Sequence, residues 1–240
     1  MIGVADLQGH WQRDWIKAPG FEDHTTRVHW MQAGALFADI RVPLDRPDLT
    51  RRDCLADLTQ PELAQLLAAE GFAGTITVAE NRCTWHREIN WHEEPDINDI
   101  GLMSFEDGAL IEDGVLAEYR ELWRRRPNEK LRGHRLTFGD QRAVLIENHS
   151  VFLVAVGPVP QGNTTALTAH LKTGDASPEA LRQHFESTYC MGHWDGESGI
   201  AELATNPFCE GREVLQRGSA FHWSGPTFDG ETYAQVLRAA

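Results

Sequence analysis

The stretch RVHWMQAGALFADIRVP, residues 27–43, decides the fold because a second version of it follows later in the chain. Two short apolar runs surround Gly34, and glycine accepts the backbone angles of a tight turn. The later stretch RAVLIENHSVFLVAVGP, residues 142–158, has the same length, begins with Arg and ends with Pro. An offset of 115 residues within 240 predicts a duplicated unit, although similar hairpins also arise by chance in unrelated chains.

Strand patterns dominate the rest of the chain. Runs of β-branched and aromatic residues alternate with Gly, Asn, Asp and Pro, as in GTITVAENRCTWHREINW at residues 74–91, where Asn81 marks a turn. Asp-Gly turn dipeptides follow at 107–108 and 113–114. A series of such hairpins favours closed antiparallel barrels, because closure leaves no exposed sheet edge.

Helix signals are few, and they occur at matching places in the two units. One helix is expected with Pro61 near its first position and Gly71 as its stop. A second is expected with Ser177 as its N-cap, followed by Pro178, and ending near Gly192. The two prolines are offset by 117 residues, close to the offset of the hairpins.

Trp11 and Trp123 supply a third correspondence, at an offset of 112 residues. Each unit then consists of a Trp-containing opening, a hairpin that ends in Pro, one short helix and further strands. The sequence therefore predicts a mainly β protein with two tandem antiparallel β-barrels, each with one short helix. The expected N-terminal barrel spans residues 1–112, and the C-terminal barrel spans residues 113–240.

Composition limits the classes of partner and cofactor. The net charge of −14 opposes binding to nucleic acid and to anionic membranes. Four widely spaced cysteines form no CxxC motif and no zinc-finger spacing, so free, mostly buried thiols are expected and no metal is predicted. Nucleotide-binding glycine motifs are absent, and no cofactor is predicted. The opening MIGVADLQGHW is unlike a secretory signal, which leads us to expect a cytoplasmic protein.

Three stretches resemble a family of uncharacterised bacterial and fungal proteins. EGFAGT at residues 70–75, WHEEPDINDIG at 91–101 and RELW at 120–123 occupy the places of that family's patterns. The resemblance implies two lipocalin-like (calycin-like) barrels. The fungal member is known mainly as a binding partner of a casein kinase, a partnership that we do not carry to this chain. None of these motifs is catalytic, so the resemblance transfers no active-site residue.

Strand alternation selects the candidate site residues. Residues 37, 39 and 41 share one face of the first hairpin, and odd-numbered residues share one face of the strand 83–91. If the tryptophan face points inward, charged groups stand among aromatic ones, as in a ligand pocket. The predicted ligand-binding residues are Trp30, Phe37, Asp39, Arg41, Trp85, Arg87 and Trp91.

The second copy of the hairpin carries apolar residues at the corresponding positions, namely Phe152, Val154 and Val156, which predicts a barrel filled by its own side chains. We therefore expect an intracellular lipocalin-like protein whose N-terminal barrel binds a small, partly apolar and anionic ligand. In the competing interpretation, Asp39 and Arg41 face water or pair with each other across a turn, and the tryptophans only fill a small core.

Two other functions remain open at this point. In the first, the barrels are inert scaffolds whose surface binds a protein partner. Alternatively, Asp39 or His86 acts as the general base of a small-molecule isomerase or hydrolase. No spacing in the chain requires a nucleophile or an acid–base pair, so no catalytic residue is assigned.

Overall fold

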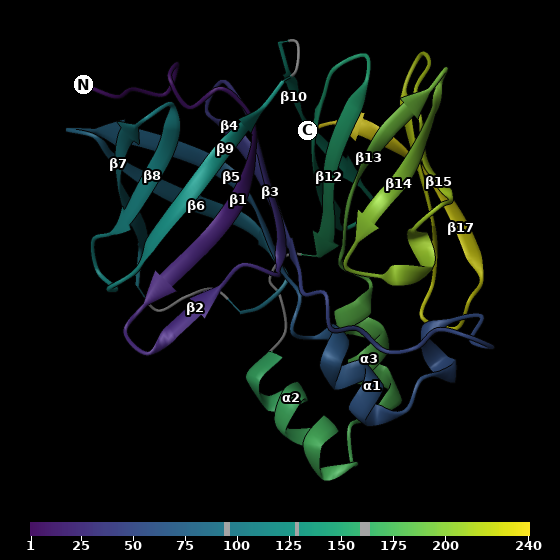
Figure 1. Ribbon diagram of the computed structural model, residues 1–240. Helices are drawn as coiled ribbons and strands as arrows, with labels where there is room; N and C mark the ends of the chain where they lie inside the picture. Colours follow the sequence, from purple (N-terminus) through teal and green to yellow (C-terminus); the bar gives the residue numbers. More distant parts are fainter. Residues whose placement is uncertain (94–96, 128–129, 159–163) are drawn as a thin grey trace.

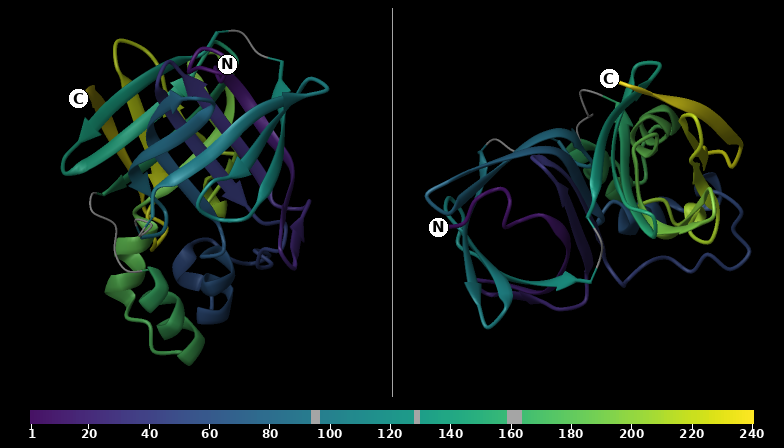
Figure 2. Two further views of the ribbon diagram at one scale, coloured as in Figure 1. Left: turned by 90° about the vertical axis from the view of Figure 1, so that its left-hand side faces the viewer. Right: turned by 90° about the horizontal axis from the view of Figure 1, so that it is seen from above.

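Two closed antiparallel barrels stand side by side, with short helices below them (Figures 1 and 2). The computed structural model describes residues 1–93, 97–127, 130–158 and 164–240. Positions 94–96 of the family-like segment 91–101 lie outside the described residues. The right-hand view of Figure 2 looks down both barrels and shows each as a separate ring. The predicted fold class, mainly β with two tandem antiparallel barrels, is confirmed.

The first barrel contains eight strands, and β1 pairs with both β3 and β9 to close it. A short strand, β2 (Phe21–Asp23), extends the end of β1. The barrel strands are β1 (Gly9–Ala18), β3 (Arg27–Ala33), β4 (Leu36–Val42), β5 (Glu70–Ala79), β6 (Arg82–Asn90), β7 (Asp99–Glu106), β8 (Ala109–Gly114) and β9 (Arg120–Arg126).

The second barrel also has eight strands and closes where its first strand pairs with its last. Its strands are β10 (Arg132–Phe138), β11 (Gln141–Glu147), β12 (Val151–Pro158), β13 (Thr188–Asp195), β14 (Ser198–Ala204), β15 (Glu213–Gln216), β16 (Phe221–Pro226) and β17 (Thr232–Ala239). The repeated sequence stretches form β3–β4 and β11–β12, which are the second and third strands of their barrels.

Helices follow the third strand in both barrels. The first barrel inserts α1 (Gln60–Leu66), whose Thr59–Glu62 capping box satisfies backbone groups of its first turn. The second inserts α2 (Thr164–Thr173) and α3 (Pro178–Phe185), so the expectation of one helix per barrel was wrong for this unit. Ser177 caps α3 as predicted, but the helix ends at Phe185 because Thr188–Asp195 is needed as the partner of β12. Short 3₁₀ turns occur at Leu55–Asp57 and Pro207–Cys209.

The division of the chain between the barrels lies later than the expected boundary after residue 112. Strand β9 pairs with β8 and β1, so the strands of the first barrel continue to Arg126, and those of the second begin at Arg132. Trp123 therefore does not open the second barrel. It lies opposite Arg13 on the strand next to Trp11, within the same barrel.

A shared apolar core joins the two barrels and the helices. The outward faces of β4 and of β11–β12 contribute Ile40, Val144 and Leu153, all nearly inaccessible to solvent. Full burial of such a side chain stabilises the fold by about 1.5–3 kcal/mol. This packing explains why both faces of β12 are apolar: one face lines its own barrel, and the other contacts the neighbouring barrel. All four cysteines are free and buried, as expected.

Candidate functional site

The first barrel has an apolar end built from aromatic side chains. Trp30 and Phe37 point inward from β3 and β4, and Trp85 joins them from β6. The Trp30 ring meets the rings of Trp85 and Trp123 edge-on, with centroids 5.9 and 5.8 Å apart. Such edge-to-face contacts are a favoured geometry for aromatic pairs. The inward orientation predicted for Trp30, Phe37 and Trp85 is what the structure shows.

The opposite end of the same barrel holds charged groups. Asp39 is only 2% exposed, and its Oδ1 accepts a hydrogen bond of 2.9 Å from Arg41 Nε. Arg41 also lies 3.7 Å from Glu121 Oε1 and 4.0 Å from Glu70 Oε2. Asp39 and Arg41 do not face water, because both side chains enter the barrel, but they do pair with each other, as the competing interpretation allowed.

Neighbouring strands complete this buried network. Arg13 on β1 donates to Glu121 at 2.6 Å and to Asp23 at 3.2 Å. Burial raises the pKa of Asp39 to about 6, an effect that the Arg41 cation opposes. Because Asp39 is enclosed and paired, it is not placed to abstract a proton from a bound substrate.

A second carboxyl group lies deeper in this network. The Oε1 and Oε2 atoms of Glu112 accept hydrogen bonds from the Tyr119 hydroxyl at 2.8 Å and the Trp123 indole at 3.1 Å. Burial raises the Glu112 pKa well above its ordinary value, and the nearby Glu121 carboxylate acts in the same direction. The first barrel is therefore aromatic at one end and charged at the other.

Arg87 lies at the charged end but is already engaged. Its guanidinium stacks over Phe72, 3.7 Å from the ring centroid, and it forms an ion pair with Asp99. It also borders a small cleft of about 130 Å³ whose wall includes Leu116 and Tyr119. The structure thus brings Asp39, Arg41 and Arg87 together around Phe72.

Trp91 lies outside the first barrel, so its predicted position was wrong. A β-bulge interrupts the pairing of β5 with β6, where Gly74 opposes Arg87 but Ala73 opposes Ile89. The extra residue reverses the alternation beyond this point. Trp91 consequently packs in the core between the barrels, with its ring 5.7 Å from Phe185.

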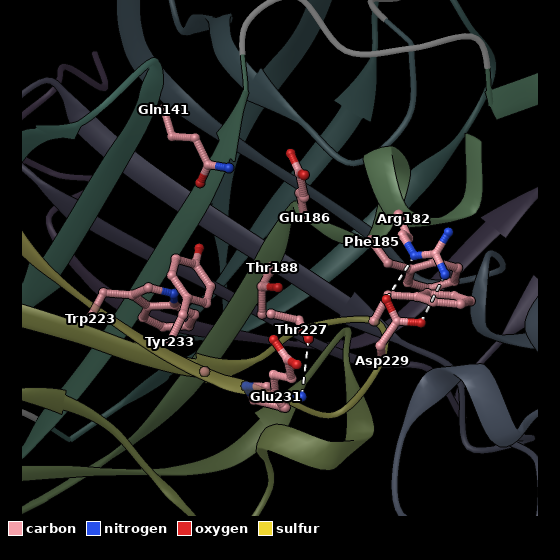
Figure 3. A pocket seen from close by; sticks show the side chains of 13 residues that line it. Gln141, Arg182, Phe185, Glu186, Thr188, Trp223, Thr227, Asp229, Glu231 and Tyr233 are labelled. Carbon is pink, nitrogen blue, oxygen red and sulfur yellow. Dashed lines mark hydrogen bonds and ion pairs between the residues drawn. The ribbon is translucent and has the colours of Figure 1, made fainter. Parts of the chain in front are cut away.

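A pocket with four aromatic side chains in its wall belongs to the second barrel, which the sequence predicted to be filled. It has a volume of about 390 Å³ and lies where α3 and the β16–β17 turn meet one end of the barrel. Figure 3 shows Trp223 and Tyr233 together on one flank and the Arg182–Asp229 pair on the other. The lining residues are Gln141, Arg182, Phe185, Glu186, Thr188, Trp223, Gly225, Pro226, Thr227, Phe228, Asp229, Glu231 and Tyr233.

Contacts within the pocket wall and behind it hold the wall in place. Arg182 on α3 binds both carboxylate oxygens of Asp229, at 2.7 and 3.0 Å. The backbone N–H of Ala56, from the insertion of the first barrel, donates to the Phe228 carbonyl at 3.0 Å. Gly230 has a φ of +88° and packs against Cys54 from the same insertion. Every lining residue therefore belongs to the second half of the chain, and contacts from the first half support the turn that carries Phe228 and Gly230.

Sequence reasoning missed this pocket because its residues come from three separate segments, at residue 141, at residues 182–188 and at residues 223–233. The signal that was available is the alternation in FHWSGPTFDGETY, residues 221–233, which sets Trp223 and Tyr233 on either side of a Gly-Pro and Asp-Gly turn. That pattern predicts a hairpin, but it does not show that an α-helix covers the barrel end beside it.

Chemistry based on histidine or a metal finds little support in the part of the chain that the structure describes. His86 is exposed on the outer face of β6, where its ring lies 2.9 Å from Thr77 Oγ1. Among the described residues, no group of three or more His, Cys, Asp or Glu side chains is arranged to hold a metal ion. Within the same residues, no helix has the length and apolar character needed to cross a membrane.

Comparison with known proteins supports the architecture. No protein-family model matches the chain, and no curated protein matches it. Among solved structures, the crystal structure of the uncharacterised Saccharomyces cerevisiae protein YLR301w matches with a TM-score of 0.52 at 10% sequence identity. The match covers 96% of this chain and 98% of that chain. At this identity the likeness concerns the fold, so this chain and the yeast protein are similar over their whole two-barrel arrangement.

Proposed function

We propose that this chain is a lipocalin-like binding protein for a small, partly apolar molecule, and that the ligand occupies the pocket of the second barrel. The observation that carries the proposal is the 390 Å³ pocket, which combines an aromatic wall with a few polar groups. Ligand sites in proteins have this size and composition. The hydrogen bond from Ala56 and the Arg182–Asp229 pair reduce the ordering that binding requires.

The first barrel is the second candidate, as the sequence analysis expected. Its charged end offers Arg87 beside the 130 Å³ cleft, a place where an anionic group has a cation to bind. Binding deeper in the barrel requires displacement of the Arg41–Asp39 pair, and breaking a buried ion pair costs about 3–5 kcal/mol. The second barrel imposes no such cost, so we favour it.

A fragment library screened by ligand-observed NMR tests the proposal and separates the two sites. We expect hits whose binding weakens at least tenfold in Tyr233→Leu, because truncation of one aromatic wall removes on the order of 1.4 kcal/mol of contact. The matched control is Trp15→Leu, which replaces a partly exposed aromatic residue on β1, far from the pocket in sequence and in the other barrel.

The outcome in a third variant, Arg87→Leu, assigns the site. Hits that survive Tyr233→Leu but disappear in Arg87→Leu would move the function to the first barrel. A screen that yields no hit with any variant would favour the scaffold function, in which the surface of the two barrels binds a protein partner. Each variant is compared with the parent by circular dichroism, so that a loss of binding is not mistaken for a loss of fold.

A further inference from the structure

The charges around the pocket of the second barrel are unbalanced. Four ionisable side chains that carry charge at neutral pH line it, of which Glu186, Asp229 and Glu231 are acidic. The single cation, Arg182, is held by both oxygens of Asp229 and is turned toward that partner (Figure 3). Neither Glu186 nor Glu231 forms an ion pair with another described residue. Two carboxylates therefore remain for whatever enters the pocket.

An adjoining cleft extends the acidic surface. It is lined by Asp140 at the β10–β11 turn and shares Gln141 and Glu186 with the pocket. The Oε1 atom of Gln141 is buried and accepts no hydrogen bond from the described residues. A buried carbonyl oxygen without a donor is costly, and a ligand N–H group removes that cost. Gln141 Oε1 is therefore an acceptor that lacks a donor among the described residues.

The aromatic side chains supply the complementary part of the site. Phe185 comes from α3, Trp223 and Tyr233 from paired strands, and Phe228 from the turn that joins them. The faces of aromatic rings attract cations, and clusters of them form the cages that recognise ammonium groups. An anion would meet repulsion from Glu186 and Glu231 and would gain nothing from these ring faces.

We propose that the pocket selects an organic cation, namely an ammonium compound with a small aromatic or aliphatic body. The ammonium group lies near Glu186 and Gln141, Glu231 adds electrostatic attraction from the opposite side of the pocket, and the apolar body lies against Trp223 and Tyr233 (Figure 3). This inference rests on the proposed function, since it names the class of ligand for that site. It replaces the anionic ligand that the sequence analysis expected for the first barrel.

Three probes of similar size and different charge test the inference. They are 2-phenylethylamine, which is cationic at pH 7.4, the neutral 2-phenylethanol, and the anion phenylacetate. Binding is followed through the indole N–H signal of Trp223 in ¹H–¹⁵N spectra, which Trp223→Phe identifies. We expect the amine to bind at least about tenfold more tightly than the alcohol, and phenylacetate to bind most weakly.

Charge-neutral variants test whether the carboxylates of Glu186 and Glu231 cause the preference for the amine. Glu186→Gln and Glu231→Gln each lower the affinity for the amine about fivefold and leave the alcohol unchanged, because exposed carboxylates contribute modestly. Glu197→Gln is the matched control, an exposed carboxylate at the β13–β14 turn outside the pocket lining, and it changes neither affinity. All three positions are exposed, so the substitutions leave the fold intact.

Other results would overturn the cation preference or the roles of Glu186 and Glu231. Equal affinity for amine and alcohol, or tighter binding of phenylacetate, would overturn the cation preference while leaving the proposed binding function in place. If none of the three probes moves the Trp223 signal, the ligand class is refuted, whereas the binding function of this pocket is refuted only if the fragment library also yields no hit that depends on Tyr233. An amine preference that persists in the double variant Glu186→Gln/Glu231→Gln would also overturn the assignment of these carboxylates.

Discussion

Replacing Arg41 with Met removes the cation beside Asp39 and makes the stability of the protein depend more steeply on pH. In the parent protein the buried Asp39 has a pKa of about 6, raised from its ordinary value of 3.8. A carboxyl group with a raised pKa stabilises the folded state below its ordinary pKa. That contribution is lost as the pH rises through the folded-state pKa.

The magnitude follows from linkage between protonation and folding. Between pH 5 and pH 8 a pKa of 6 makes Asp39 contribute a loss of about 1.4 kcal/mol to the free energy of unfolding. An opposite charge in direct contact lowers a carboxyl pKa by about 1–3 units, so without Arg41 the folded-state pKa rises to roughly 8. The corresponding loss over the same interval is then about 3.6 kcal/mol. The variant should therefore lose about 2 kcal/mol more than the parent.

Urea unfolding at pH 5 and pH 8, followed by tryptophan fluorescence, measures this difference. Arg124→Met is the matched control, because Arg124 pairs with Asp14 on the surface, where such pairs contribute at most about 1 kcal/mol. In the double variant Asp39→Asn/Arg41→Met the additional pH dependence should disappear. The reasoning is refuted if Arg41→Met shows the pH dependence of the parent, or if the double variant keeps the steeper dependence.

Three further substitutions probe other features. Gly74→Ala should destabilise the protein by about 2 kcal/mol or more, because the added Cβ lies 2.0 Å from the His86 carbonyl oxygen. A urea unfolding curve that matches that of the parent would contradict the bulge geometry. Trp91→Ala should cost about 3–5 kcal/mol in the same assay, because this ring is fully buried between the barrels. Gly230→Ala should lower the free energy of unfolding by about 1 kcal/mol and weaken amine binding, because Gly230 has a φ of +88° and contacts Cys54. An unchanged affinity for the amine, measured by calorimetry, would show that the turn does not shape the pocket.

Alternation of side chains predicted the inward positions on β4 correctly. The hairpin of residues 27–43 has regular pairing between β3 and β4, so the inward positions of Phe37, Asp39 and Arg41 followed directly from a period of two. The same rule failed beyond Glu88, because a bulge adds one residue to β6 and changes the face on which Trp91 lies. A bulge depends on the partner strand, here on Gly74, and a single strand's pattern does not contain that information.

Sequence reasoning also missed the division between the barrels and the pocket of the second barrel, because both depend on contacts between segments that are distant in the sequence. Trp123 resembles Trp11 in its local sequence, yet it belongs to the strand that closes the first barrel through pairing with β1. Closure is a contact between residues more than a hundred positions apart. In the second barrel, Phe152 and Val154 do fill the interior as expected. The pocket lies at the barrel end, where α3 and the β16–β17 turn determine the available space.

The double-sided burial of β12 limits how such a chain can diverge. A change at Leu153 disturbs the junction with the neighbouring barrel, whereas a change at Val154 disturbs the interior of its own barrel. Few positions on this strand therefore tolerate substitution. A single barrel separated from its neighbour would expose an apolar, aggregation-prone surface. For protein engineers, the natural unit of exchange is the pair of barrels, not the single barrel.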